Sequence, residues 1–448
     1  TIDGNSMTYS YDKAFVDWEI NFGIGVSAHG TVMMAYPEIT DPAEAKAKFI
    51  EAVQNGDTAW LAPVAAAWNT GYQVTDATAE ETDPTTGSLK NVFLSNGAYR
   101  VEEVVADDHV TLVANELYKW GPSPKYERIT IREIADPTAA VQAVDNGDVQ
   151  VASGQPTADL LALVQGLTNG DYVGGDEAAY EHVDLTFNNG GPFDPKTYGG
   201  DTAKALAVRQ AFLLSIPRDQ ILDTIIKPLN PNAVLRNSLL AIPGSPNYDT
   251  IVAGNGSDFY GGSDAERITK AKELLAAAGV KAPIDVKFWY PEGNVRRGQE
   301  FELIQANALQ SGFNVIDTSE PNWEFTDPSL FEINPHDAVI FAWSSSSLAV
   351  TGNDQMYGTG KPSNFQDYSN KVVDDNLAAV ETELDPAKQA ELLTNVESAL
   401  WGDAASLPIF QFPGLTWWDK GTTGVSPNPL STAYFWNFWE WAPAAAAQ

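Results

Sequence analysis

The feature that most constrains the fold is a repeated order of helix, glycine and short apolar strand in the second half of the chain. In SDAERITKAKELLAAAGV, apolar residues at helical spacing share one face and Gly279 ends the pattern. IDVKFWY (284–290) alternates like a strand, and FELIQANALQSGFNVIDT repeats helix, Gly312 and strand. The strand HDAVIFAW and helices over 371–382 and 386–401 follow. This alternation predicts an α/β lobe.

The first half of the chain has a different pattern. Asp136 as N-cap, Pro137 at the first helical position and Gly147 at the end predict a helix that a short strand follows. Two antiparallel strands are predicted around the Asp107-Asp108 turn, with a third strand in YERITIREI. MTYSYDKAFVDWEINFG, near the start, is typical of a strand leading into a structured segment. This half is therefore predicted to be α+β.

Two extended segments can join the halves. HVDLTFNNGGPF (182–193) leaves the first lobe, and SLPIFQFPGLTWW (406–418) returns to it. We expect residues 1–187 and 411–448 to form the first lobe and residues 188–410 the second. Two crossings make a hinge with a cleft beneath it, and clefts between domains are common ligand sites.

Charge excludes several partners. The 448 residues include 60 acidic and 26 basic side chains, which give a net charge of −34. Such a field repels nucleic acid and anionic membrane surfaces, so we expect neither as a partner. We interpret the acidity as a solubility feature. No apolar run approaches the ~20 residues that span a bilayer.

Sequence signatures of catalysis and metal binding are missing. The chain has no cysteine, and its four histidines are scattered without an HExxH or paired spacing. It lacks a GxSxG elbow, a phosphate-binding loop of the GxxxxGK[ST] type and a GxGxxG after a strand. We therefore expect a protein that is not an enzyme and that has no metal site and no cofactor.

Four segments in this order resemble a known family, the family 5 extracellular solute-binding proteins of ABC importers, of the oligopeptide- and dipeptide-binding type. SNGAYRVEEVVADDHVTLVANELYKWG and IADPTAAVQAVDNGDV are similar to two of its motifs. VRQAFLLSIPRDQIL is similar to a third, with Pro217 where aspartate is usual, and GTGKPSNFQDYSNKVVDDNL to a fourth. The resemblance covers about residues 11–420, and an actinobacterial-type branch is its nearest likeness.

The resemblance implies a two-lobed α/β fold of the type II periplasmic-binding-protein kind, with hinge crossings and without its N-terminal part. Thr1 begins in mid-pattern, so we expect a C-terminal fragment of a longer parent. The parent is implied to be an extracellular, cell-surface or periplasmic lipoprotein that touches the membrane only through a lipid anchor on the missing N-terminus. The implied partners are a small-molecule ligand and the ABC permease subunits.

The resemblance also implies a binding site. Where peptide-binding members carry a GWxxD pattern with an ammonium-binding aspartate, this chain has Trp343, Ser344, Ser345 and then Ser346 in the acidic position. Ile340 stands where some members carry an arginine. An aromatic face beside neutral hydroxyls suits a neutral polyhydroxylated or glycolipid-like ligand as well as a peptide. Trp323 matches a further pocket tryptophan.

Several of these residues have a structural alternative. Trp343 is either a ligand contact or core, and the serine run is either a pocket or a loop. Asn364 either orients the ligand or caps the helix from Val372. The hinge residues Phe187, Asn188, Phe410 and Gln411 either line the cleft or pack the hinge. We expect the tail AYFWNFWEW (433–441) to be an aromatic strand that closes the first lobe, with a sugar platform as the alternative.

The predicted function is therefore the solute-binding component of an importer. Two other functions stay open at this point. One is an envelope-associated regulatory or structural protein that keeps the same fold. The other is a carbohydrate-active hydrolase, which turnover of a glycan panel would reveal.

Overall fold

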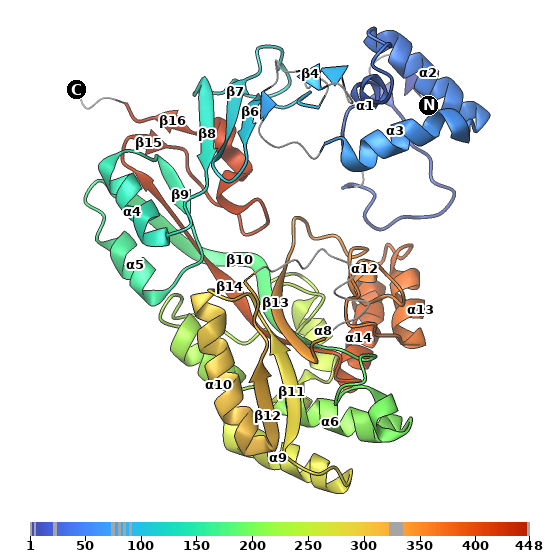
Figure 1. Ribbon diagram of the computed structural model, residues 1–448, viewed down its shortest axis with the longest axis vertical. Helices are drawn as coiled ribbons and strands as arrows, with labels where there is room; N and C mark the ends of the chain where they lie inside the picture. The colour runs from blue at the N-terminus through green and yellow to red at the C-terminus, as the bar shows by residue number, and fades with distance from the viewer. Residues whose placement is uncertain are drawn as a thin grey trace.

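The structure is a computed structural model that describes residues 2–3, 6–20, 25–72, 77–78, 82–83, 87–88, 92–321 and 335–445. Figure 1 shows an upper and a lower part connected by two long strands, β10 (Gly170–Leu185) and β14 (Ser406–Asp419). The N-terminal helices and the C-terminal segment both lie in the upper part. The fold is a mixed α/β fold of the type II periplasmic-binding-protein kind.

The largest sheet has six strands in the order β12-β11-β13-β10-β14-β9. Its other members are β9 (Val151–Ser153), β11 (Ile284–Trp289), β12 (Phe313–Asp317) and β13 (Ala338–Ser344). β11 runs parallel to β12 and β13, whereas β10 is antiparallel to both β13 and β14. The strands predicted in the second half of the sequence are confirmed.

β10 and β14 pair along most of their length, and we call them the hinge ribbon. Asp176 faces Pro413 and the next pair is Tyr180 with Gln411, so three residues of β10 oppose one residue of β14 at this point. This irregularity separates an exposed half of β10, up to Asp176, from a buried half that starts at Ala178. The second predicted crossing matches β14, whereas the predicted start at residue 182 lies inside β10.

Side chains alternate across the sheet, so its two faces have different cores. One face carries Val183, Phe288 and Ile340, which pack against helices α6 (Thr202–Leu214), α9 (Asp264–Ala277) and α10 (Val295–Ser311). The other face carries Tyr180, which packs with residues of α13 (Lys371–Val380) and α14 (Pro386–Gly402). The remaining helical segments of this part are η2 (Pro195–Tyr198), α7 (Arg218–Ile221), η3 (Leu222–Ile226), α8 (Tyr248–Gly254), η4 (Ser257–Tyr260) and α12 (Asn353–Tyr357).

The upper part is built from smaller units. The sheet β3-β6-β7-β8 contains β3 (Ala77–Thr78), β6 (Tyr99–Val105), β7 (His109–Ala114) and β8 (Arg128–Arg132). β6 and β7 pair from Val105↔His109 around Asp107, which has a φ of 57°, so the predicted hairpin and third strand are confirmed. Helices α1 (Ala28–Ala35), α2 (Pro42–Asn55) and α3 (Thr58–Thr70) pack on each other around a core of their own.

Two further helices pack on the hinge ribbon. α4 (Pro137–Asn146) begins at Asp136, whose carboxylate accepts from the Thr138 amide, and ends at Gly147, which has a φ of 82°. This helix and α5 (Ala158–Gln165) share a core with Trp417 of β14. The predicted caps are therefore confirmed. The boundaries proposed at 187/188 and 410/411 remain a prediction.

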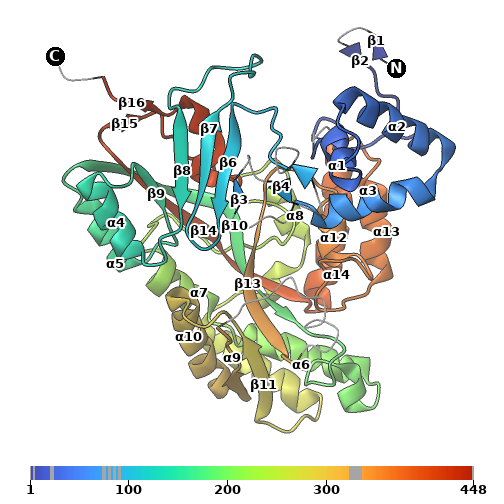
Figure 2. The same cartoon turned by 45° about the horizontal axis from the view of Figure 1, so that its top comes forward.

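Two expectations about the ends of the chain are wrong. Residues 8–20 contain no strand, and a turn occupies residues 16–20. The tail forms the 3-10 helix η5 (Ala433–Glu440), because Phe435 and Phe438 stack at 4.6 Å across the three-residue spacing of such a helix. Figure 2 shows η5 behind the β6–β8 sheet, where Phe438 contacts Tyr99 at 5.3 Å. The short strands β1 (Ile2–Asp3), β2 (Ser6–Met7), β4 (Thr82–Asp83), β5 (Gly87–Ser88), β15 (Thr422–Thr423) and β16 (Ala442–Pro443) complete the assignment.

Candidate functional site

The site that the sequence predicts lies at the end of β13, beside the irregular part of the hinge ribbon. Trp343 pairs with Tyr180 of β10, and its side chain is half-buried. The indole stacks on Phe365 at 5.8 Å and meets the edge of Phe341 at 5.2 Å. One part of the ring is therefore packed, and the remaining part is accessible to solvent.

The serines that follow Trp343 differ in exposure. Ser344 and Ser346 are exposed, whereas Ser345 is half-buried. The Ser345 amide donates to the Ala178 carbonyl at 2.8 Å, and its carbonyl accepts from the Ser431 amide at 3.0 Å. We call residues 345–351 the serine loop. Its start is fixed by both the hinge ribbon and the C-terminal segment.

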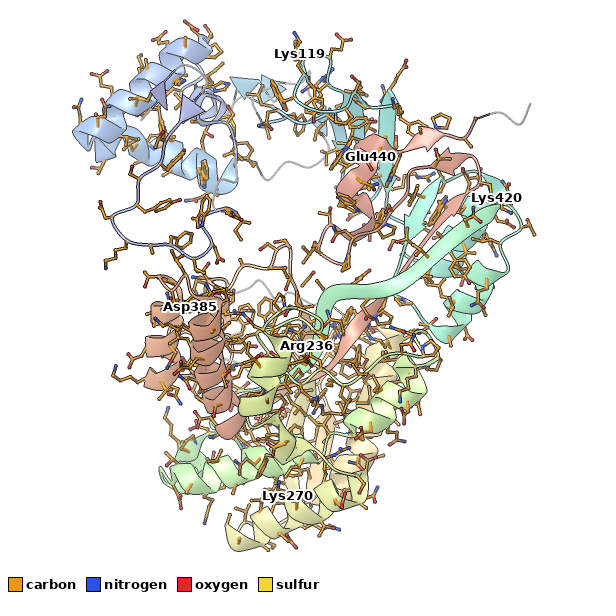
Figure 3. All side chains as sticks on the ribbon, turned by 180° about the vertical axis from the view of Figure 1, so that it is seen from behind. Lys119, Arg236, Lys270, Asp385, Lys420 and Glu440 are labelled. Atoms are coloured by element: carbon orange, nitrogen blue, oxygen red, sulfur yellow. The ribbon has the colours of Figure 1, made fainter. Side chains whose placement is uncertain are left out.

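A buried polar layer lies beneath Trp343. Three residues at every second position of β10 lie on the same face and are all buried: Tyr180, His182 and Asp184. The His182 ring lies 6.4 Å from the Trp343 ring, and its Nε2 is 3.5 Å from an Asp184 carboxylate oxygen. The Arg236 guanidinium lies 3.7 Å above the Tyr180 ring, at the middle of the ribbon in Figure 3.

Burial dominates the electrostatics of this layer. It raises the pKa of Tyr180 to about 12, and the nearby Arg236 charge opposes that shift. The Tyr180 hydroxyl pairs with the Tyr357 hydroxyl at 3.2 Å. Burial also lowers the pKa of Arg236, which donates to the carbonyls of Ser238 and Leu239. The guanidinium of Arg236 beneath the site thus already has hydrogen-bond partners inside the protein.

The predicted residues Phe187, Asn188 and Asn364 lie in the segment after β10 and in the loop before α13. Phe187 lies two residues beyond the end of β10 and packs against the same buried cluster as Trp343, which includes Tyr180 and Tyr368. It is half-buried beneath the Arg209 guanidinium at 4.5 Å, and exposed Asn188 donates to the Asp367 carboxylate. The structure therefore brings Phe187 and Trp343 to one cluster, and Phe365, which follows Asn364, stacks on Trp343.

Asn364 is not the helix cap, and its role in orienting a ligand stays a prediction. Its amide nitrogen donates to the carbonyls of Gly358 and Tyr368, at 2.9 and 2.7 Å, and its oxygen accepts from the Tyr368 amide. These three bonds brace the loop before α13. The helix starts at Lys371, and its cap is Asn370, which accepts from the Val372 amide at 2.8 Å.

Phe410 and Gln411 pack inside the hinge. Phe410 is completely buried and belongs to the core under α10. Gln411 is 8% exposed, accepts from Arg236 at 2.8 Å and donates to the Glu177 carbonyl. This arrangement fits the hinge-packing alternative for both residues. Trp323 lies outside the described residues.

A separate hollow of about 170 Å³ lies on the hinge ribbon and includes none of the predicted residues. Its lining comes from the ribbon, the start of α5 and the loop after η3, and consists of Pro156, Leu161, Gly174, Gly175, Leu229, Asn230, Pro231, Pro413, Gly414 and Leu415. Across the described ranges, no three histidine, aspartate or glutamate side chains gather as a metal site would require. None of the helices in the described part of the chain has the length and apolar character needed to cross a bilayer.

Sequence reasoning missed several residues around Trp343. The alternation in YEHVDL indicates that Tyr180 and His182 share a face, but their pairing with β13 needs the sheet register. Phe365 and Ser431 reach the site through loops. Asp17, which binds the far end of the serine loop, has no sequence signal at all.

Solved structures share this fold. The periplasmic EDTA-binding protein EppA matches with a TM-score of 0.69 and 21% identity, covering 82% of this chain and 69% of its own. The oligopeptide-binding protein AppA of Bacillus subtilis, solved with a nonapeptide, matches with a TM-score of 0.59 and 17% identity, over 78% and 66% of the two chains. These likenesses show the fold.

Several curated relatives come from mycobacteria. An uncharacterized lipoprotein of Mycobacterium leprae is 25% identical over 447 residues, 96% of this chain and 70% of that protein. A lipoprotein of Mycobacterium tuberculosis is 24% identical and covers 85% of this chain, which spans 62% of that relative's length. The oligopeptide-binding protein OppA of M. tuberculosis is 23% identical over 66% of this chain and 48% of its own length.

The model of the bacterial extracellular solute-binding proteins, family 5 Middle, matches residues 31–365. The match spans the β6–β7 hairpin, α4, the first strand of the hinge ribbon and β13 with Trp343, in the order that the sequence motifs predict. The chain therefore belongs to the bacterial extracellular solute-binding proteins of family 5.

Proposed function

We propose that this chain is the ligand-binding component of an ABC importer and that it does not catalyse a reaction. The relatives described as lipoproteins support an extracellular, surface-anchored location, and the oligopeptide-binding relative supports a role in uptake. Ligand would bind between the two parts that the hinge ribbon connects and would favour their closure. The closed form would then dock on permease subunits.

We further propose that the ligand is neutral and rich in hydroxyls, such as a glycoside or a glycolipid headgroup, in preference to a free peptide. One observation carries this proposal. The half-buried indole of Trp343 stands beside exposed Ser344 and Ser346, and in the described part of the chain no lysine or arginine lies over its ring. An indole offers an apolar face to a sugar ring, and serine hydroxyls both donate and accept hydrogen bonds.

The same site is poorly suited to a charged peptide terminus. Ser346 supplies no carboxylate for an ammonium group, and Ile340 is completely buried on the opposite face of the sheet. An ammonium group taken from water without a counter-charge costs several kcal/mol. A free peptide would therefore lose the contact that an acidic residue provides.

Calorimetric titration tests the preference. We expect maltotriose or monomeric octyl β-D-glucoside to bind, and trialanine to give no measurable heat. Trp343→Ala should weaken sugar binding, while Trp120→Ala, which removes a 69% exposed tryptophan in the upper part, should leave it unchanged. Micromolar binding of trialanine that requires its free amino terminus would overturn the proposal.

A further inference from the structure

Asp17 makes a concentrated set of contacts between the N-terminal segment and the lower part. Its carboxylate accepts from the Val350 amide at 3.1 Å, from the Thr351 amide at 2.9 Å and from the Thr351 hydroxyl at 2.6 Å. These partners lie more than 330 residues along the chain. Hydrogen bonds to a charged acceptor are stronger than neutral ones, so one side chain holds two backbone amides of the serine loop.

A second contact fixes the same segment to another element. The Val16 amide donates to the Glu381 carbonyl, just after α13, at 2.8 Å. We call residues 8–20 the strap. Figure 3 shows the strap descending from the N-terminal helices toward the end of the lower part that Asp385 marks. Consecutive strap residues thus bind two different elements, which defines both the position and the orientation of the strap.

The serine loop is therefore held at both of its ends. Ser431 binds Ser345 at the start, and Asp17 binds Val350 and Thr351 at the finish. Between these anchors Ser346 is exposed and Leu348 is 64% exposed. The loop begins two residues after Trp343, so the anchors determine how its hydroxyls lie relative to the indole.

We propose that Asp17 is a positioning residue: it latches the strap onto the serine loop and thereby holds that loop in the arrangement that accepts ligand beside Trp343. Release of the latch frees two backbone amides at once and lets the strap move away from the lower part. The role in ligand binding rests on the proposed function. The latch itself does not, so it can be tested without any ligand.

Hydrogen exchange of the ligand-free protein tests the latch. Asp17→Ala should speed exchange at the amides of Val350 and Thr351 by about tenfold or more, because each amide loses a charge-assisted bond. Asp17→Asn keeps one acceptor oxygen, so its exchange rates at these amides should lie between those of the parent chain and Asp17→Ala. Asp12→Ala removes an exposed carboxylate from the same strap and should change neither amide. Equal exchange in the Asp17 and Asp12 variants would overturn the latch.

A distance measurement tests the motion of the strap. The chain contains no cysteine, so cysteines introduced at exposed Glu51 on α2 and exposed Lys388 on α14 are unique sites for spin labels. The distance distribution should broaden in Asp17→Ala and stay narrow in Asp12→Ala. An unchanged distance distribution in Asp17→Ala would overturn the proposed movement of the strap, even if hydrogen exchange at Val350 and Thr351 becomes faster.

Ligand binding separates a positioning role from a purely structural one. The probe is octyl β-D-glucoside. It should dissociate several-fold faster from Asp17→Ala than from the parent chain, while the melting temperature of the variant stays within a few degrees of the parent value. A change in melting temperature without any change in dissociation would overturn the positioning role. Failure of the probe to bind the parent chain would contradict the proposed function and leave the exchange result to decide the latch.

Discussion

At the scale of single residues, the surface of Trp343 is divided between two environments. One part of the indole packs on Phe365 and Phe341, and the rest reaches solvent at the start of the serine loop. A tryptophan that serves only the core is more fully covered, as Trp401 and Trp417 are. The partial exposure of Trp343 therefore favours a role in ligand binding, because it leaves an apolar face that a ligand can cover.

Replacement of Trp343 by alanine should affect binding more than folding. We expect affinity for a bound glycoside to fall by about 1–3 kcal/mol, the usual range for loss of an aromatic contact at a binding site. A core tryptophan would instead cost about 3–5 kcal/mol of folding stability. Calorimetry and a thermal melt of the same variant separate the two cases. A large drop in melting temperature with unchanged affinity would assign Trp343 to the core.

Single residues also mark the limit of prediction from sequence. The caps Asp136 and Gly147 were predictable, because their roles depend on neighbours only a few positions away. Asn364 was not, because its three partners are set by a loop that closes on Tyr368, and the nearby Asn370 takes the cap instead. Asp17 depends on partners at the other end of the chain.

At the scale of elements, the first turn of α10 places charged side chains against a buried core, where other buried charges pair with them. Arg296 and Arg297 in its first turn both pair with Glu181 of β10, which is completely buried. Glu300, one turn later, is also completely buried and lies 3.1 Å from the Nε of Arg296. Burial and the charge of Glu181 raise the pKa of Glu300 to about 8.

This raised pKa predicts a pH dependence. An acid whose folded pKa exceeds its unfolded value binds more protons when folded, so its contribution to stability declines as pH rises from about 4.5 to about 8. Glu300→Gln should flatten this decline and should be the more stable form at about pH 8, by a few kcal/mol as an order of magnitude. Urea unfolding across this range measures the difference.

Glu302 offers a matched control, since it is an exposed carboxylate two residues further along the same helix. Glu302→Gln should leave the pH profile close to that of the parent chain. Parallel profiles for the parent chain and Glu300→Gln would contradict the raised pKa. Both variants keep the pairing of Arg296 and Arg297 with Glu181.

Elements whose sequence pattern is local were predictable, and elements that depend on tertiary packing were not. The α/β alternation located β11, α10, β12 and β13, because amphipathic period and glycine stops are local. The aromatic tail was predicted as a strand, since aromatic residues favour strands. It forms η5 instead, because its rings stack on each other and on Tyr99 rather than along a sheet edge.

At the scale of the whole molecule, the net charge of −34 acts on every conformation. Repulsion among 60 carboxylates opposes compaction, and dissolved salt screens it. Raising sodium chloride from about 20 to about 500 mM should therefore raise the melting temperature by about 1–2 °C, roughly the effect of 1–2 kcal/mol in a chain of 448 residues. A scanning thermal melt at neutral pH measures it.

The pH provides the control for this prediction. Near pH 4 about half of ordinary exposed carboxylates are protonated, so the same salt series should produce a smaller shift. An equal shift at both pH values would mean that salt acts through something other than charge screening.

The hinge ribbon also has a consequence for how the chain acquires its shape. Trp417 and Leu415 of β14 complete the core of α4 and α5, more than 250 residues after those helices have left the ribosome. Residues 186–405, between the two ribbon strands, can collapse on local contacts while α4 and α5 still lack the β14 part of their core. The order of assembly should thus run partly against the order of synthesis: the inserted segment forms before the core of α4 and α5 is complete, since closing so long a loop is slow.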